Sequence, residues 1–245
     1  MNLAKLSVVG IGPGDYEEMT VRAVNALNAC DVIVGYHVYV DLVKAHFPEK
    51  EFHTTPMRRE VDRCKIALDI AREGRNVAMI CSGDSGIYGM AGLIYELRGE
   101  DESIEVEVVG GLTAACSGGG RLGAPLTHDF AVISLSDLLT RWELIERRLD
   151  CAARGNFGIV LYNPRSMKRS DYLQRACDIV MRHQSPDTVC GVVRNIGREG
   201  EETRVMTLAE LRDYEADMFT TAFIGNASTK IIAGKMVTPR GYRDV

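Results

Sequence analysis

Short runs of β-branched and other apolar residues alternate with segments of helical periodicity along the first half of the chain. Thr20 is typical of a helix cap, and Val21, Val24 and Leu27 follow it at intervals of three residues, as on one buried helix face. The alternation of the two patterns predicts a mainly parallel sheet covered by helices. The predicted strands are 6–9, 32–34, 77–80 and 106–109, and the further predicted helices are 87–97 and 113–122.

A turn of small residues and proline at 123–125 interrupts this series, and a second series of the same kind follows. We place a domain boundary there, which gives an N-terminal domain 1–123 and a C-terminal domain 124–245. Thr207 and Glu210 have the spacing of a helix capping box. The chain is therefore predicted to form two tandem α/β domains, and because no low-complexity linker separates them, we expect them to share a cleft. In the second domain the predicted strands are 130–135, 159–162, 189–193 and 219–224, and the predicted helices are 142–152 and 170–181.

Composition and charge argue against several classes of function. The net charge of -5 disfavours nucleic acid as the main partner, because phosphate binding needs a basic face. The seven cysteines are dispersed and form no C-x-x-C pair, which favours reduced core thiols over disulfides or a metal site. No apolar run approaches the roughly 20 residues that span a bilayer, and the N-terminus shows no signal-peptide pattern. We therefore expect a cytoplasmic protein without a membrane partner.

A glycine-rich loop, GIGPGD at 10–15, follows the first predicted strand directly. A dinucleotide site of the oxidoreductase type needs G-x-G-x-x-G, and Asp15 occupies the position of the third glycine. Its carboxylate would repel a pyrophosphate, and Pro13 removes one amide that could donate to a phosphate. The loop is therefore expected to approach a ligand without phosphates, with a purely structural turn as the alternative.

Two more loops of small residues follow predicted strands. One reads CSGDSGIYG at 81–89 and the other GGLTAA at 110–115. Parallel sheets bind ligands at the carboxyl ends of their strands. Asp84 could accept hydrogen bonds from hydroxyl or ammonium groups there, although a carboxylate at this position could equally be a helix N-cap. Together the three loops predict a pocket for a polar, hydroxylated cofactor without phosphates.

These loops occur in the order found in the tetrapyrrole methylases, the class III S-adenosylmethionine-dependent methyltransferases, and the chain resembles that family. The matching motifs are G-x-G-P-G-D at 10–15, S-G-D-x-x-x-Y-G at 82–89 and G-x-T-A at 111–114. The resemblance implies two α/β domains with S-adenosylmethionine bound between them, and usually a homodimer. Ser85 and Gly110 stand where the family often has proline, and these departures concern the rigidity of the loops.

The same resemblance implies cofactor contacts, position by position. Because the transferred methyl group is already activated as a sulfonium, no residue needs to act as a nucleophile, and S-adenosylhomocysteine is the product. The contacts come from the three loops and from two positions of the second domain. The residues implied are Gly12, Pro13, Gly14, Gly83, Asp84, Ile87, Thr113, Ala114, Asn163 and Thr220.

Longer strings resemble one branch of the family, which methylates C(17) of precorrin-3B or cobalt-factor III in cobalamin biosynthesis and contracts the ring, giving precorrin-4 or cobalt-precorrin-4. They include HDFAVISLSDLLT at 128–140, LYNPRS at 161–166 and TPRGY at 238–242. Methylation at another tetrapyrrole carbon and a non-catalytic protein that binds the macrocycle stay open as alternatives. The presence of cobalt in the substrate stays open as well.

The implied substrate carries many carboxylates, which gives basic side chains a role despite the acidic total. We expect Arg58, Arg59 and Arg165 to bind these carboxylates, with ordinary solvated surface charge as the alternative. The basic residues form two clusters, Arg58, Arg59 and Arg63 in the first and Arg165, Lys168 and Arg169 in the second.

Ring contraction also needs an acid–base group. His128 precedes Asp129 where the second domain begins, and histidine can exchange protons near neutral pH. His128 is therefore the catalytic candidate, with a structural hydrogen-bonding role as the alternative.

Overall fold

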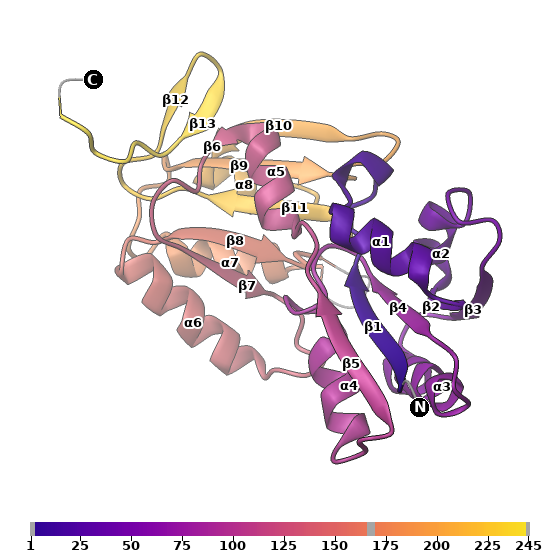
Figure 1. Ribbon diagram of the computed structural model, residues 1–245. Coiled ribbons are helices and arrows are strands. Elements are labelled where there is room, and N and C mark those ends of the chain that lie inside the picture. The colour runs from indigo at the N-terminus through magenta and orange to yellow at the C-terminus, as the bar shows by residue number, and fades with distance from the viewer. Residues whose placement is uncertain (1–2, 166–169, 244–245) are drawn as a thin grey trace. The chain divides into compact units, whose positions relative to one another are not determined.

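The computed structural model describes residues 3–165 and 170–243, and the chain divides into two compact units, 1–113 and 114–245. We call them the N-terminal unit and the C-terminal unit. Each contains a five-stranded sheet with helices against it (Figure 1). Both units are therefore α/β, as predicted.

The sheet of the N-terminal unit is parallel, as its alternating pattern predicts. Its strands are β1 (Ala4–Gly10), β2 (Val32–Tyr36), β3 (Glu51–Thr55), β4 (Val77–Cys81) and β5 (Ile104–Val109). They lie in the order β3-β2-β4-β1-β5, and every described pair runs parallel. Gly10 lies opposite Cys81, and Val9 lies opposite Val109. The carboxyl ends of the three strands that carry the glycine loops therefore meet at one edge.

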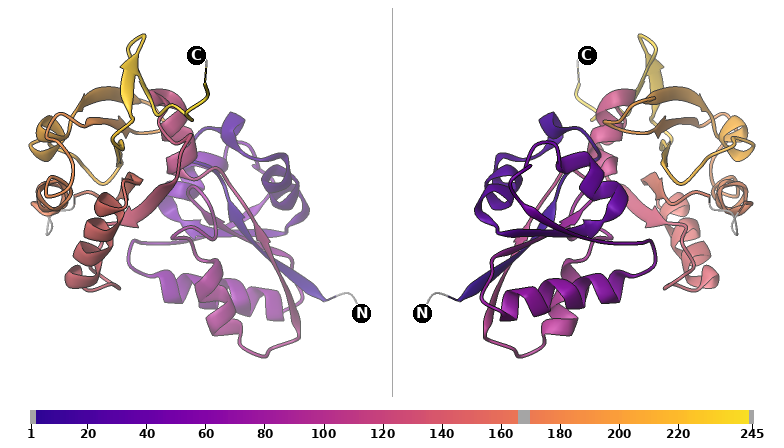
Figure 2. Two further views of the ribbon diagram at one scale, coloured as in Figure 1. Left: turned by 90° about the vertical axis from the view of Figure 1, so that its left-hand side faces the viewer. Right: turned by 90° about the vertical axis from the view of Figure 1, so that its right-hand side faces the viewer.

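Helices cover both faces of this sheet (Figure 2). They are η1 (Tyr16–Glu18, a 3-10 helix), α1 (Val21–Ala29), α2 (His37–Val43), α3 (Glu60–Arg72) and α4 (Ala91–Arg98). Along β1, Leu6 and Val8 pack with α3 and α4, whereas Val9, together with Ile11 just after the strand, packs with α1 and α2. Each such fully buried side chain contributes about 1.5–3 kcal/mol through the hydrophobic effect. The alternation along the strand thus fixes which helices lie on which face.

The structure confirms some of the helix starts predicted for this unit and corrects others. The side chain of Thr20 accepts a hydrogen bond from the amide of Ala23 at 3.1 Å and caps α1, which confirms the predicted cap. The helix predicted from residue 87 begins only at Ala91, because the preceding residues continue the loop after β4. The elements β3, α2 and α3 were not predicted.

The C-terminal unit contains a mixed sheet. Its strands are β7 (Phe130–Ser134), β8 (Gly158–Tyr162), β9 (Val189–Arg194), β10 (Glu202–Thr207) and β11 (Thr220–Ile224). They lie in the order β10-β9-β11-β8-β7; β7 and β8 run parallel, and the other described pairs run antiparallel. Thr207 and Glu210 form the predicted capping box at the start of α8 (Leu208–Arg212).

The division between the units lies before helix α5 (Ala114–Leu122), and not after Gly123 as predicted. Its Leu122 packs with Val160 and Phe223 of the second sheet. A Cβ at Gly118 would lie 2.9 Å from the Phe223 ring, so glycine permits this close approach. The helix therefore belongs to the C-terminal unit, and the boundary falls between residues 113 and 114. The opposite face of the sheet is covered by α6 (Trp142–Arg154), α7 (Tyr172–Val180) and α8.

A small three-stranded sheet completes the C-terminal unit. It consists of β6 (Gly123–Ala124), β12 (Lys230–Ile232) and β13 (Lys235–Val237), in the order β12-β13-β6. The hydroxyl of Thr238 donates to the carbonyl of Pro125 at 2.7 Å. The turn predicted at 123–125 is therefore held by the end of the chain, through pairing with β13 and this side-chain bond.

The cysteines are less uniformly buried than expected. Cys30, Cys64, Cys81, Cys177 and Cys190 are buried, in agreement with the prediction of core thiols. That prediction is wrong for the remaining two, Cys116 and Cys151, which are exposed on helices. No described helix is long and apolar enough to cross a membrane.

Candidate functional site

The loops after β1 and β4 are joined by their backbones. The amide of Gly12 donates to the carbonyl of Gly83 at 3.1 Å, and the amide of Gly83 donates to the carbonyl of Gly12 at 2.7 Å. Ile11 adds a bond from its amide to the carbonyl of Cys81 at 2.9 Å. Gly12 and Gly83 both have positive φ, 75° and 69°, a conformation that favours glycine. The two motifs therefore form one rigid unit.

The loop after β5 lies directly on this pair of loops. A Cβ at Gly111 would lie 2.3 Å from the carbonyl oxygen of Gly83 and 2.5 Å from that of Gly10. A Cβ at Gly10 would lie 2.7 Å from the amide nitrogen of Gly111. Only glycine fits at these two positions, so the three loops predicted from the sequence converge. Gly10 was not among the predicted site residues, although it is the first glycine of its motif.

Asp84 holds the second and third loops together through both carboxylate oxygens. Its Oδ1 accepts from the amides of Gly86 at 2.8 Å and Ile87 at 3.0 Å, and its Oδ2 accepts from the amide of Gly111 at 2.9 Å. Helix α4 begins at Ala91, so Asp84 caps a turn and not that helix. A carboxylate has about four acceptor positions, and these three bonds leave room for a ligand donor.

The departures from the family pattern have structural explanations. Ser85 is fully buried, and its hydroxyl donates to the carbonyl of Val109 at 2.9 Å, which ties the second loop to the end of β5. Thr20 donates to the carbonyl of Gly110 at 3.3 Å. Asp15, which matches the family motif and departs only from the dinucleotide motif, accepts from the amide of Glu17 at 3.4 Å and caps the short helix η1. Side-chain hydrogen bonds thus hold the loops at both positions that depart from the motifs, Ser85 and Gly110.

The remaining predicted loop residues differ in exposure. Pro13 and Gly14 are buried, as is Thr113. Ile87 is exposed, and its neighbour Tyr88 is exposed with a φ of 56°, an unfavourable conformation for an aromatic residue. Backbone strain of this kind concentrates at functional sites. Apolar side chains at the loop tips are therefore available to a ligand.

Two of the three predicted cofactor residues of the C-terminal unit, Asn163 and Thr220, already have hydrogen-bond partners within that unit. Asn163, with a φ of 53°, donates from Nδ2 to the hydroxyl of Ser134 at 2.9 Å. Thr220 is buried, and its hydroxyl donates to Asp217 at 2.8 Å. Ala114 is the first residue of α5, which follows Thr113 directly in the chain. A role for these residues in cofactor binding stays a prediction.

The predicted substrate and catalytic residues are mostly exposed. Arg58 has a φ of 65°, and Arg59 forms an ion pair with Asp62. His128 lies with its Nδ1 4.0 Å from a carboxylate oxygen of Asp129, which is too far for a hydrogen bond. Of the second basic cluster Arg165 is partly buried. Lys168 and Arg169 lie outside the described residues.

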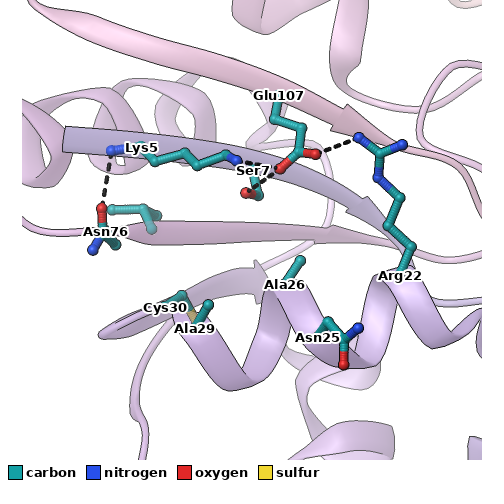
Figure 3. A pocket seen from close by; sticks show the side chains of 10 residues that line it. Lys5, Ser7, Arg22, Asn25, Ala26, Ala29, Cys30, Asn76 and Glu107 are labelled. Carbon is teal, nitrogen blue, oxygen red and sulfur yellow. Dashed lines mark hydrogen bonds and ion pairs between the residues drawn. The ribbon is translucent and has the colours of Figure 1, made fainter. Parts of the chain in front are cut away.

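A separate hollow of about 300 Å³ lies against the amino-terminal half of β1, far along the strand from the loops (Figure 3). Its charged groups are paired with one another: Lys5 donates to Glu107 at 2.8 Å, and Arg22 also binds this carboxylate. These cations hold the pKa of Glu107 below its ordinary value of 4.5, Arg22 having the larger effect. Parallel sheets bind ligands at the opposite edge, so we place the site at the loops and not in this hollow.

Comparisons with known proteins place the chain in a family. The model of the family described as tetrapyrrole (corrin/porphyrin) methylases matches residues 5–212. The chain is 46% identical over 238 residues to a Salmonella typhimurium protein named probable cobalt-factor III C(17)-methyltransferase, with 97% of this chain and 99% of that protein covered. It is also 46% identical to the Archaeoglobus fulgidus cobalamin biosynthesis protein CbiHC, covering 97% of this chain and 53% of that protein. The crystal structure of the methyltransferase CobJ matches with a TM-score of 0.89 at 35% identity, over 96% of this chain and 100% of that one.

Proposed function

Because this chain belongs to the tetrapyrrole methylase family, we propose that it transfers a methyl group from S-adenosylmethionine to C(17) of cobalt-factor III or precorrin-3B and promotes contraction of the ring. The similarity to the protein of Salmonella typhimurium extends over nearly the full length of both chains. That protein's name favours the cobalt-containing substrate.

The cofactor assignment rests on one observation: the backbone amides of the loops already donate hydrogen bonds within the loops. Phosphate groups are bound by free backbone N–H groups at loops and helix N-termini. Here the amides of Gly12, Gly83, Gly86, Ile87 and Gly111 all donate to acceptors within the loops. The site is therefore suited to a ligand recognised by acceptors and apolar contacts, and S-adenosylmethionine has hydroxyl and ammonium donors, an adenine ring and no phosphate.

The chain's own contribution to the reaction is binding and orientation. S-adenosylmethionine, when bound, supplies an electrophilic methyl group on its sulfonium. The carboxylate of Asp84 has acceptor capacity left for a hydroxyl or ammonium donor, and the loop backbones are fixed before binding. Holding two reactants in line can supply about 7–11 kcal/mol of the barrier. Rigid loops at the sheet edge therefore suit a reaction whose nucleophile belongs to the substrate.

Two measurements test the proposal. S-adenosylhomocysteine is expected to raise the melting temperature, since a ligand selective for the native state stabilises it by mass action, and NAD is expected to leave it unchanged. The protein should then convert cobalt-factor III or precorrin-3B, with S-adenosylmethionine, to a product one methyl group heavier with the spectrum of a contracted ring. A melting temperature that rises with NAD and does not change with S-adenosylhomocysteine would refute the cofactor assignment.

The alternatives give different products. A methylase for another carbon would give the same mass increase without the contracted-ring spectrum. A non-catalytic carrier would bind the macrocycle but retain no radiolabelled methyl donor. We further propose a homodimer in solution, which sedimentation equilibrium would test.

A further inference from the structure

Arg63 is a buried arginine at the carboxyl edge of the first sheet. Only 5% of its surface is exposed. Its Nε donates to the hydroxyl of Thr55 at 2.8 Å, and its Nη2 donates to the carbonyl of Pro56 at 3.2 Å. The guanidinium carbon lies 5.8 Å from the centre of the Tyr36 ring. Since Thr55 and Tyr36 end β3 and β2, Arg63 lies at the same edge as the glycine loops.

The charge of Arg63 is not balanced by a neighbouring acid. Among residues 3–165 and 170–243, no carboxylate lies within ion-pair distance of its guanidinium. The other arginines of α3 and its N-cap differ: Arg59 pairs with Asp62, and Arg72 pairs with Asp69 and Asp101. A buried charge without a counterion is unfavourable for folding. Such a charge is therefore expected to have a function.

Arg63 also retains hydrogen-bonding capacity. A guanidinium has five N–H donors, and the described residues accept from two of its groups, at Nε and Nη2. The remaining donors include both N–H groups of Nη1. A planar fork of this kind binds a carboxylate through two parallel bonds.

The strand that leads into the Asp84 loop lies beside the strand that Arg63 contacts: β4 pairs with β2, and the guanidinium faces the ring of Tyr36, the last residue of β2. Cys81 ends β4, immediately before that loop, and burial raises the pKa of its thiol to about 11. Arg63 acts on the same thiol in the opposite direction, whereas Asp84 raises its pKa further. The charges of Arg63 and Asp84 therefore act in opposite directions on the thiol at the end of β4.

We propose that Arg63, and not the exposed Arg58 and Arg59, is the residue of this unit that binds a ligand carboxylate in the active site. The inference rests on the proposed function for the identity of the ligands. Both proposed ligands carry carboxylates. Those of the tetrapyrrole are on its acid side chains, and that of S-adenosylmethionine is on its amino-acid part. The substrate side chains are the expected source, because they are numerous and lie around the rim of a large ring.

The variant Arg63→Met tests this, since it keeps an unbranched stem and removes the charge and the donors. Affinity is measured for two probes, uroporphyrin III as a stable tetrapyrrole polycarboxylate and S-adenosylhomocysteine. Arg63→Met should weaken uroporphyrin binding about tenfold or more, the loss of a hydrogen-bonded charge pair. Arg63→Lys, which keeps the charge without the planar fork, should lose less. Arg72→Gln, on the same helix, is the matched control and should bind both probes normally.

The two ligand sources give separate results. If Arg63→Met loses affinity only for uroporphyrin, Arg63 binds a carboxylate of the substrate. If it loses affinity only for S-adenosylhomocysteine, Arg63 binds the carboxylate of the cofactor. The methyl ester of uroporphyrin should bind Arg63→Met and the unmodified protein equally. Because these measurements need no turnover, the inference can hold even if the protein fails to methylate C(17).

Stability separates ligand binding from a structural role. If Arg63 only joins α3 to the end of β3, Arg63→Met should melt at a lower temperature with both affinities unchanged, and this result would overturn the proposal. If Arg63 binds a carboxylate, removing an unbalanced buried charge should leave the melting temperature equal or higher.

Discussion

The carboxylate of Asp84 accepts a hydrogen bond from the amide of Gly111 at 2.9 Å, across 27 positions of the sequence. The same side chain holds its own loop through the amides of Gly86 and Ile87. Asp84 therefore organises two of the three loops while keeping acceptor capacity for a ligand. The two roles, in loop structure and in binding, can be separated by experiment.

Asp84→Ala should lower both stability and affinity for S-adenosylhomocysteine. The amide of Gly111 is partly buried and would lose its partner, so the free energy of unfolding should fall by about 1–3 kcal/mol. Affinity, measured by calorimetry, should fall about tenfold or more if the carboxylate also accepts from the ligand. Asp84→Asn is the matched variant and should keep more of the stability than of the affinity. Reduced stability with unchanged affinity would show a purely structural role.

Gly111→Ala should disrupt the site through sterics alone. The added Cβ would lie 2.3 Å from the carbonyl oxygen of Gly83, and backbone atoms at that distance must move. We expect loss of the thermal shift with S-adenosylhomocysteine and a lower melting temperature. Gly92→Ala in α4 is the control: a Cβ there has no described atom within 4 Å, and alanine in a helix is more stable than glycine by about 0.5–1 kcal/mol. Normal binding by Gly111→Ala would contradict the convergence of the three loops.

Glu107 should contribute stability that depends on pH. Arg22 and Lys5 lower its pKa in the folded state below the ordinary 4.5. The contribution is therefore fully present above that value and disappears as the pH falls through the lower folded pKa. Glu107→Gln should lower the free energy of unfolding by about 1 kcal/mol at pH 7, and the difference should shrink in acid. Chemical denaturation between pH 7 and 3 measures this, with the exposed Glu105→Gln as control. A difference that is constant with pH would argue against these ion pairs.

His128→Ala tests the catalytic candidate of the C-terminal unit. If His128 serves ring contraction, the variant should bind S-adenosylhomocysteine normally and accumulate a methylated, uncontracted product or turn over slowly. Mass and absorption spectra distinguish these products. His183→Ala, which removes a hydrogen bond with Asp150 in the same unit, serves as the control. Contracted product formed at the unmodified rate would remove His128 from the mechanism.

The fold could be predicted wherever apolar residues repeat with the period of the element. Leu6 and Val8 on one face of β1 and Val9 on the other produce such a signal. Strand β3 does not, because it is an edge strand on which the polar residues Glu51 and His53 form a hydrogen bond with each other. Polar edge strands are common in sheets, since they prevent unwanted pairing with other chains. Periodicity therefore identifies central strands better than edges.

The site could be predicted in its parts but not in its connections. The glycine motifs indicated that loops after three strands approach a ligand, and the structure brings these loops together. The bonds from Gly111 to Asp84 and from Ser85 to Val109 depend on the packing of strands far apart in sequence. Burial of Arg63 depends likewise on the unpredicted β3 and α3. Sequence motifs therefore identify the residues of the site, but their hydrogen-bond partners depend on tertiary packing.

The paired bonds between Gly12 and Gly83 involve main-chain atoms alone. Their amide hydrogens should therefore exchange slowly with deuterated solvent, although they lie in loops, because exchange requires the two segments to separate. A loop that is ordered before the ligand arrives loses little conformational entropy on binding. Association should then proceed without a slow ordering step, and differences in affinity between ligands should appear mainly in their residence times.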